Sequence, residues 1–104
     1  MKYYKAEFDK QGDVLNIKVK GRLDVTSSPE MEEELNPYLP ETREIVMDLG
    51  SVDYISSAGI RLLLATEQYL EGRGGSMKLI NVNDHIYKVF DMVGFANLMT
   101  IERL

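Results

Sequence analysis

Two adjacent serines, Ser56 and Ser57, are the residues of this 104-residue sequence best placed to take part in chemistry. They follow an apolar stretch and stand just before Ile60–Ala65, where a helical pattern of apolar residues opens. A serine there can cap the helix, because its hydroxyl accepts a hydrogen bond from an unpaired amide of the first turn. One hydroxyl can instead be phosphorylated, since the positive end of the helix dipole stabilises an added negative charge. The spacing leaves both roles open for both serines.

A catalytic role for these serines finds little support in the sequence. Asp24, Ser57 and His85 supply the residue types of a catalytic triad. However, Ser57 lies in the run Ile-Ser-Ser-Ala-Gly and not in the G-x-S-x-G turn that exposes a nucleophile. His85, the only histidine, stands at an expected helix start, where a capping or surface role is simpler. The glycines at 72–75 lack the Lys-Ser/Thr ending of a phosphate-binding loop, and the glutamates at 32–34 are better explained as a solvated helix face than as a metal site. The sequence therefore predicts a protein that is not an enzyme and holds no cofactor or metal.

Composition and charge narrow the class of protein. The length predicts one domain, over residues 1–104, with a real hydrophobic core. The absence of cysteine excludes a disulfide framework. A formal net charge of -5 argues against nonspecific binding to nucleic acid or anionic membranes, which requires clustered Lys and Arg. The N-terminus lacks the apolar core of a signal peptide, and no run approaches the roughly 20 apolar residues that cross a bilayer. We expect a cytoplasmic protein without direct membrane insertion.

The first half of the chain predicts a hairpin, a helix and a buried strand. Tyr3–Phe8 and Val14–Val19 flank a turn signal at 10–13, and so short a connection predicts antiparallel pairing. A β-branched run at Ile45–Met47 predicts a buried strand that enters a polar turn around 50–51.

The first helix has two registers for its start. Ser27 forms a capping box with Glu30, or Ser28 is the cap and Pro29 the first helical residue. Met31 and Leu35 lie on the inner face of this helix. Pro37 should end or bend the helix at Asn36.

Two more helices and a strand follow the serines. The longest helix runs to about Glu71, and its wide apolar stripe predicts packing on a sheet and a second contact. A strand covers Met77–Val82, and Asn83 or Asp84 then caps a helix that ends at Gly94. Beyond Phe95 a short helix and a last strand at 99–101 both fit the pattern. The apolar stripe of the longest helix is Ile60, Leu63, Leu64 and Leu70, broadened by Leu62, Ala65 and Tyr69, and that of the last helix is Ile86, Val89, Phe90 and Val93.

The order of these elements predicts an α/β fold. Strand–helix–strand units favour parallel pairing through a crossover helix, whereas the hairpin adds an antiparallel edge. We expect a mixed sheet of four to five strands, an N-terminal hairpin followed by βαβα, with the helices packed against it.

Three runs of residues resemble the markers of one family. The run MDLGSVDYISSAGIRLLL is similar to the central motif of STAS domains, the family of bacterial anti-sigma factor antagonists. GRLD, at residues 21–24, resembles the second marker of that family, and GGSMKLINVNDHIYKVFDMVGFANLM, from residue 74, resembles its C-terminal half. The resemblance covers nearly the whole chain in the order and spacing of the family.

The resemblance implies which residues form the site. The family's phosphorylated serine lies two positions before the motif glycine, which is Ser57 here, and the acidic residue beside it corresponds to Asp24. Many relatives carry an aspartate where this sequence has Ser56, and a second small hydroxyl residue at the position of Ala58, so Ser56 stays a rival phosphate acceptor. Asp48 matches a strand-end aspartate with a structural role. The implied partner surface comprises Asp24, Ser56, Ser57, Ala58, Gly59 and Arg61.

The resemblance also implies a function based on exchange of partners. The unmodified protein, a monomer when free, would bind a kinase-type anti-sigma factor. That partner would use its own ATP to phosphorylate the serine and so release the protein, and a serine phosphatase would reverse the change. The alternative is a STAS subunit of a membrane lipid-transport ATPase that uses the same surface without being phosphorylated.

Overall fold

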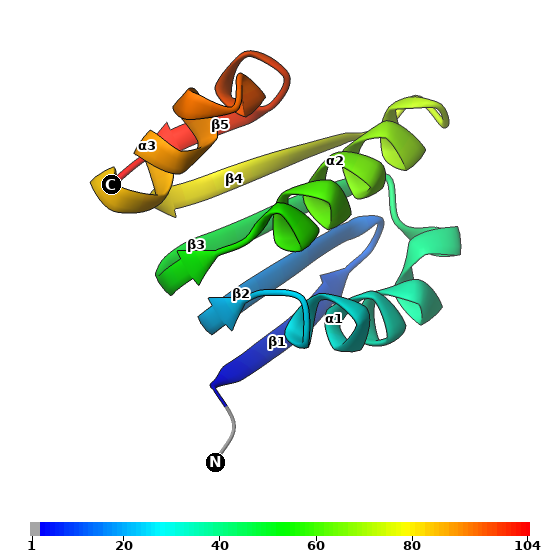
Figure 1. Cartoon of the computed structure of the whole chain (residues 1–104). Helices are drawn as coiled ribbons and strands as arrows, with labels where there is room; N and C mark the ends of the chain where they lie inside the picture. The colour runs from blue at the N-terminus through cyan, green and yellow to red at the C-terminus, as the bar shows by residue number, and fades with distance from the viewer. Residues whose placement is uncertain (1–2) are drawn as a thin grey trace.

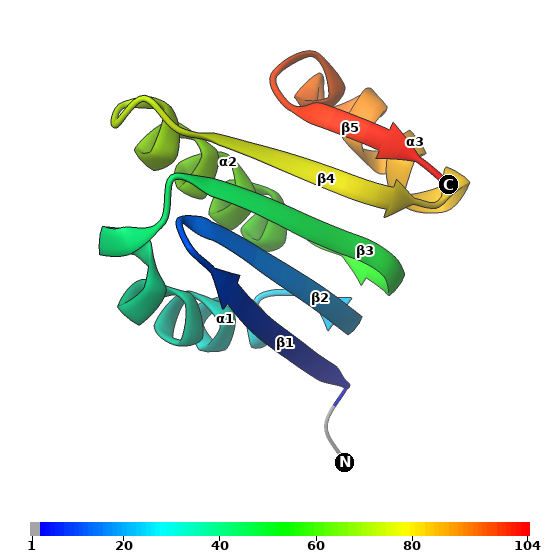
Figure 2. The same cartoon turned by 180° about the vertical axis from the view of Figure 1, so that it is seen from behind.

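The computed structural model describes residues 3–104 and places five strands in one sheet, with the helices on one face of it (Figures 1 and 2). In chain order the elements are β1 (Tyr4–Gln11), β2 (Val14–Leu23), α1 (Ser27–Leu35), the 3-10 helix η1 (Asn36–Glu41), β3 (Glu44–Ile55), α2 (Ser57–Glu71), β4 (Ser76–Val82), α3 (Asp84–Met92), the 3-10 helix η2 (Phe95–Asn97) and β5 (Thr100–Arg103).

The sheet has the mixed topology expected from the sequence. Its strand order is β1-β2-β3-β4-β5, with β1 antiparallel to β2 and every other neighbouring pair parallel. Both features expected of the C-terminal segment are present, since η2 precedes β5 and β5 pairs with β4. The predicted α/β fold is therefore confirmed, with five strands.

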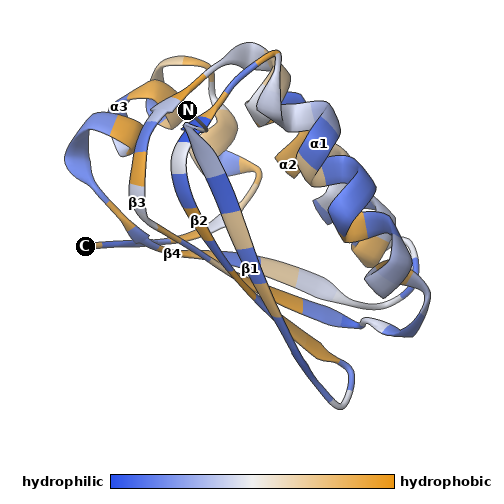
Figure 3. Cartoon of the chain, turned by 90° about the horizontal axis from the view of Figure 1, so that it is seen from below, coloured by the Kyte–Doolittle hydropathy of each residue, from blue (hydrophilic) through white to orange (hydrophobic). Residues whose placement is uncertain are grey.

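Alternation along the strands separates a core face from a solvent face. Ile17, Met47 and Leu79 are paired across β2, β3 and β4, and all three are buried. The next residue of each strand points the other way, which gives an outer row of Lys18, Asp48 and Ile80. Figure 3 shows the same alternation of hydrophilic and hydrophobic residues along β1 and β2. The helices cover the core face with Met31 and Leu35 of α1, Leu63 and Leu70 of α2, and Ile86 and Phe90 of α3.

Strand β3 is longer than the sequence pattern indicates. The polar turn expected at Gly50 and Ser51 is absent, and β3 continues to Ile55. Its pairing with β4 ends at Asp48, whereas its pairing with β2 continues to Ile55 through two register shifts. The amide of Gly50 donates to the Asp48 carboxylate at 2.8 Å, which satisfies the backbone where β4 diverges. Polar residues are tolerated in this part of β3 because they occupy its solvent-exposed positions.

Two helix faces differ from the predicted stripes. In α2, Ala65 and Tyr69 are exposed, and the buried polar residue is Thr66, whose hydroxyl donates to the Leu62 carbonyl at 2.8 Å. Val93, expected on the inner face of the last helix, is 61% exposed because α3 ends at Met92. The start of α3 agrees with one of the two predicted caps, since the Asn83 side chain accepts from the Ile86 amide.

Candidate functional site

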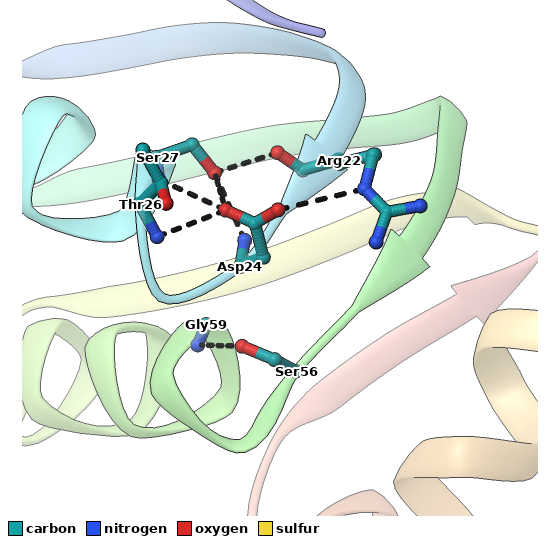
Figure 4. A network of polar contacts seen from close by, with 6 residues as sticks. All are labelled: Arg22, Asp24, Thr26, Ser27, Ser56 and Gly59. Atoms are coloured by element: carbon teal, nitrogen blue, oxygen red, sulfur yellow. Dashed lines mark hydrogen bonds and ion pairs between the residues drawn. The ribbon is translucent and has the colours of Figure 1, made fainter.

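The site lies where β2 and β3 end side by side. Leu23 and Ile55 are paired neighbours, and the amide of Ser56 donates to the Leu23 carbonyl at 3.0 Å. The loop from β2 to α1 and the first turn of α2 therefore meet at one end of the sheet (Figure 4). This junction brings Asp24 and the two serines, 32 residues and more apart in sequence, to the same place.

The structure divides the roles of the two serines. Ser56 has an extended backbone, and its Oγ accepts a hydrogen bond from the Gly59 amide at 3.4 Å, so Ser56 is the N-cap of α2. Ser57 is the first residue of α2 and is exposed. Its hydroxyl makes no hydrogen bond to any other residue between 3 and 104. Ser56 thus uses its hydroxyl to hold the helix, whereas the hydroxyl of Ser57 remains available to another molecule.

Asp24 organises the loop that faces the serines. Its Oδ1 accepts from the amides of Thr26 and Ser27, both at 3.0 Å. The Ser27 hydroxyl donates to the Arg22 carbonyl at 2.6 Å and accepts from the Asp24 amide at 2.9 Å. Figure 4 shows these bonds as one network around the Asp24 carboxylate.

Both predicted registers for the start of α1 are therefore wrong. The N-cap position is Thr26, whose side chain makes no capping bond, and the free amides are bound by Asp24 instead. An aspartate that bonds amides two and three residues ahead forms a local turn, which competes with capping by the serines that follow. Of these, Ser28 is left with a buried hydroxyl that has no partner within residues 3–104.

The same network keeps Asp24 negatively charged. The hydrogen bond from the Ser27 amide, followed by those from the Thr26 amide, the Ser27 hydroxyl and Arg22, lowers the pKa of the Asp24 carboxyl below its ordinary value. Arg22 lies 3.5 Å from the carboxylate through its Nε and 4.2 Å from the centre of the Tyr54 ring. Sequence reasoning did not identify Arg22 or Tyr54, because their contact arises from pairing between β2 and β3.

Gly59 joins the two halves of the junction. It is buried, and a Cβ there would lie 2.7 Å from the Leu23 carbonyl oxygen and 2.9 Å from Cγ1 of Ile55. The missing side chain lets the first turn of α2 approach the ends of β2 and β3. Of the other residues expected on the partner surface, Ala58 is half-buried and Arg61 is exposed.

The remaining candidates lie outside the junction. His85 is exposed in the first turn of α3, and within residues 3–104 it makes no hydrogen bond to Asp24 or Ser57. Asp48 is inside β3 and bonds the Gly50 amide and, at 3.1 Å, the Asn81 side chain, in keeping with the structural role expected for it. Between residues 3 and 104 no helix has the length and apolar character needed to cross a membrane.

The chain combines a mixed sheet, helices on one face of that sheet, and an exposed serine at the start of α2. The model of the STAS domain family matches residues 5–103, and the chain therefore belongs to the STAS domain family. An anti-sigma-B factor antagonist of Staphylococcus aureus is 34% identical over 92 residues, which cover 88% of this chain and 85% of that protein.

Solved structures share the fold at lower sequence identity. The anti-sigma factor antagonist SpoIIAA in its unphosphorylated form has a TM-score of 0.80 at 20% identity, covering 94% of this chain and 86% of that one. The phosphorylated form of SpoIIAA from Bacillus has a TM-score of 0.73 at 20% identity, covering 94% and 89%.

Proposed function

We propose that this chain is an anti-sigma factor antagonist whose binding to a kinase-type anti-sigma factor is controlled by phosphorylation of Ser57. The observation that carries the proposal is the division of roles at the junction: Ser56 caps α2, while Ser57 is exposed and its hydroxyl is unbonded within residues 3–104. The staphylococcal relative, named an anti-sigma-B factor antagonist, supports the partner class. In this proposal the chain regulates and does not catalyse.

The proposed switch transfers a phosphoryl group within the complex. The Ser57 oxygen attacks the γ-phosphorus of ATP held by the partner, ADP leaves, and the hydroxyl proton passes to a base of the kinase. A phosphatase later hydrolyses the phosphate ester and regenerates the serine. The chain itself holds no nucleotide, and it acts as a monomer when free.

Charge at the junction explains why the fold would survive phosphorylation while the complex would not. The phosphate adds about -1.5 to -2 charges at the first turn of α2, where free amides and the helix dipole stabilise an anion. A partner surface fitted to the neutral serine would have to desolvate that charge. Asp24, which stays ionised on the adjacent loop, adds to the negative potential that the partner meets. We expect a loss of affinity on the order of a hundredfold, about 2.7 kcal/mol.

The alternative, a STAS subunit of a lipid-transport ATPase, has weaker support. It requires the same surface but no phosphorylation, and so gives no role to an exposed serine beside a capping one. The relative that is 34% identical is named an antagonist, not a transporter subunit.

The proposal is tested by incubating the protein with the kinase-type anti-sigma factor of the same genome and ATP, and by mapping the phosphate by mass spectrometry. Ser57→Ala should bind the partner and resist release by ATP, and Ser57→Asp should bind weakly while keeping its melting temperature. Ser56→Ala is the matched control: it should lose roughly 1 kcal/mol of stability with the cap, yet still be phosphorylated and released. A phosphate on Ser56, or tight binding by Ser57→Asp, would contradict the assignment to Ser57, and a chain that is never phosphorylated would leave the transporter subunit as the better explanation.

A further inference from the structure

A groove lies between α1 and α2, and one of its lining residues, Ala58, directly follows Ser57. The two helices lie side by side over the sheet, and both start at the end that carries the site (Figure 1). The groove has a volume of about 420 Å³. Its walls include Val25, Ser28 and Glu32 on the α1 side and Ala58, Arg61 and Ala65 on the α2 side.

Each helix contributes one of its faces to the groove. The lining residues of α2 recur at intervals of three and four positions, and those of α1 span one turn, so both walls are helical faces. The α2 residues are Ala58, Arg61, Leu62 and Ala65, the α1 residues are Ser28, Pro29 and Glu32, and Val25 of the preceding loop completes the lining. A ridge of side chains on a third helix has the same repeat and fits between two such walls. The small side chains of Ala58 and Ala65 leave room for that ridge. The groove therefore has the shape expected of a site for a helix, and such a helix would contact Ala58, the residue after Ser57.

One residue that lines the groove, Ser28, has a polar atom that the fold does not use. Ser28 is 5% exposed, and its Oγ is buried without a hydrogen-bond partner within residues 3–104. Buried hydroxyls are nearly always bonded, because leaving one unpaired is unfavourable. Ser28 is thus placed to exchange a hydrogen bond with a group that enters the groove.

The rims carry opposite charges that are not neutralised by the chain itself. Glu32 and Arg61 are exposed on the two walls, and neither forms an ion pair within the part of the chain from 3 to 104. Glu32 is the acidic residue of the α1 wall, and the neighbouring Glu33 and Glu34 are not part of the groove lining. Val25, an apolar residue of the lining, is 74% exposed. An occupant that complements this surface has an apolar ridge, a basic side chain facing α1 and an acidic one facing Arg61.

We propose that the groove between α1 and α2 binds an amphipathic helix of the anti-sigma factor, with an apolar ridge on its floor, a polar group bonded to Ser28 and a basic side chain opposite Glu32. This inference rests on the proposed function and extends it, because it states where the partner lies and what chemistry the partner presents. It also gives a physical reason for release. Ser57 directly precedes Ala58, which lines the groove, so a phosphate on Ser57 would add charge and bulk next to the bound helix.

Two pairs of variants test the groove separately from the switch. Glu32→Arg and Glu33→Arg reverse the same charge on adjacent exposed residues of α1, but only Glu32 lines the groove. In titrations with the purified anti-sigma factor that phosphorylates the protein, Glu32→Arg should bind at least tenfold more weakly, and Glu33→Arg should bind within about twofold of the wild type. Ser28→Ala should bind threefold to tenfold more weakly, yet melt at the same temperature as the wild type or higher, because it removes an unpaired hydroxyl. A lower melting temperature in Ser28→Ala would mean that the hydroxyl is used inside the fold, which would overturn its assigned role.

The outcomes distinguish this inference from the function on which it rests. If Ser57→Asp weakens binding while Glu32→Arg and Ser28→Ala bind as the wild type does, the groove is not the docking site and the switch stands. If the wild type binds no kinase-type anti-sigma factor of its genome, both proposals fall. A self-associated wild type that Glu32→Arg renders monomeric, seen by sedimentation without partner, would make the groove an interface between copies and would overturn the inference.

Discussion

Asp24 combines two roles that are usually separate, since one carboxylate both holds a loop and supplies the charge of the site. Because the amides of Ser27 and Thr26 bond its ionised form, its pKa is lower in the folded state than in the unfolded chain. A group whose pKa is depressed by folding stabilises the protein above its unfolded pKa of about 3.9, and that contribution disappears as the pH falls through the folded pKa.

We therefore expect the free energy of unfolding of Asp24→Asn to depend less on pH, in the acid range, than that of the wild type. The variant should be less stable than the wild type at neutral pH, and the two curves should converge as the pH falls below about 4. Urea unfolding at pH values between 3 and 7 measures the difference. Curves that stay parallel across this range would show that the amide bonds do not favour the charged form.

Gly59 allows the first turn of α2 to lie close to the strands, and adding a single methyl group at this position tests that role directly. In Gly59→Ala the new Cβ would meet the Leu23 carbonyl oxygen at 2.7 Å, and backbone cannot move aside easily. We expect a loss of about 1–3 kcal/mol in the free energy of unfolding, the usual cost of overpacking. Gly72→Ala is the control, because its Cβ would come no closer than 3.4 Å to the Gln68 carbonyl oxygen.

Gly72 has a helical backbone, so the control should be neutral or gain about 0.5–1 kcal/mol from the lower entropy of its unfolded chain. Equal stability of the two variants in chemical unfolding would remove the packing role of Gly59. A stable Gly59→Ala with weak partner binding would instead place Gly59 in direct contact with the partner.

At the scale of elements, β3 and β4 separate around a small polar cluster. Asn81 is the non-glycine residue between 3 and 104 with a left-handed backbone, at a φ of 56°, and its side chain donates to the Asp48 carboxylate. Asparagine tolerates this conformation better than alanine, because its short amide can bond locally. The cluster lets β4 turn towards α3 while β3 continues along β2.

We expect an inversion of the usual strand preferences at this position. Asn81→Gly and Asn81→Ala both lose the bond to Asp48, but only alanine keeps a Cβ at positive φ. Asn81→Ala should therefore be less stable than Asn81→Gly by about 1–2 kcal/mol in chemical unfolding. If alanine is at least as stable as glycine, the backbone at residue 81 is not left-handed in solution.

The elements also show what a sequence pattern can and cannot predict. Alternation from Val14 to Val19 and the apolar positions Met31 and Leu35 predicted the hairpin and the inner face of α1, because one buried face imposes a period. The cap of α1 was not predicted, because Asp24 competes with Ser27 and Ser28 for the free amides of the first turn. Only the geometry of the loop determines which side chain binds them. The full length of β3 escaped too, because the strand β2 that pairs with its polar end lies far away in sequence.

The same limit applies to the site. The sequence singled out Asp24 and the serine pair, but either serine could cap the helix, and only the conformation of Ser56 shows that it is the cap. Likewise, the groove between α1 and α2 depends on how the two helices lie together, which neither helix encodes alone. Residues that act through contacts between distant segments are invisible to local pattern.

Across the whole molecule, the two ends of α2 have different duties. Its N-terminus carries the candidate site, and its C-terminus is held by Arg73, which follows the helix. Nη1 of Arg73 donates to the Leu39 carbonyl at 2.9 Å and to the Tyr69 hydroxyl at 2.8 Å, and Nη2 donates to the Pro40 carbonyl at 2.7 Å. These bonds tie the end of α2 to η1, more than 30 residues earlier in the chain. With 15 residues, α2 separates its two ends by about 22 Å.

This separation predicts that stability and partner binding can be changed independently. Lysine cannot reproduce the planar fork of Arg73, so Arg73→Lys should lose part of the tie, about 1 kcal/mol, or roughly 4–8 °C in melting temperature for a chain of this size. Its affinity for the anti-sigma factor and its phosphorylation rate should equal those of the wild type at temperatures where both are folded. Asp24→Asn is the contrasting variant, because it alters the end at which we propose that the partner binds. If Arg73→Lys also weakened binding at temperatures where the variant is folded, the two ends of α2 would be energetically coupled. Stability and partner binding could then not be changed independently.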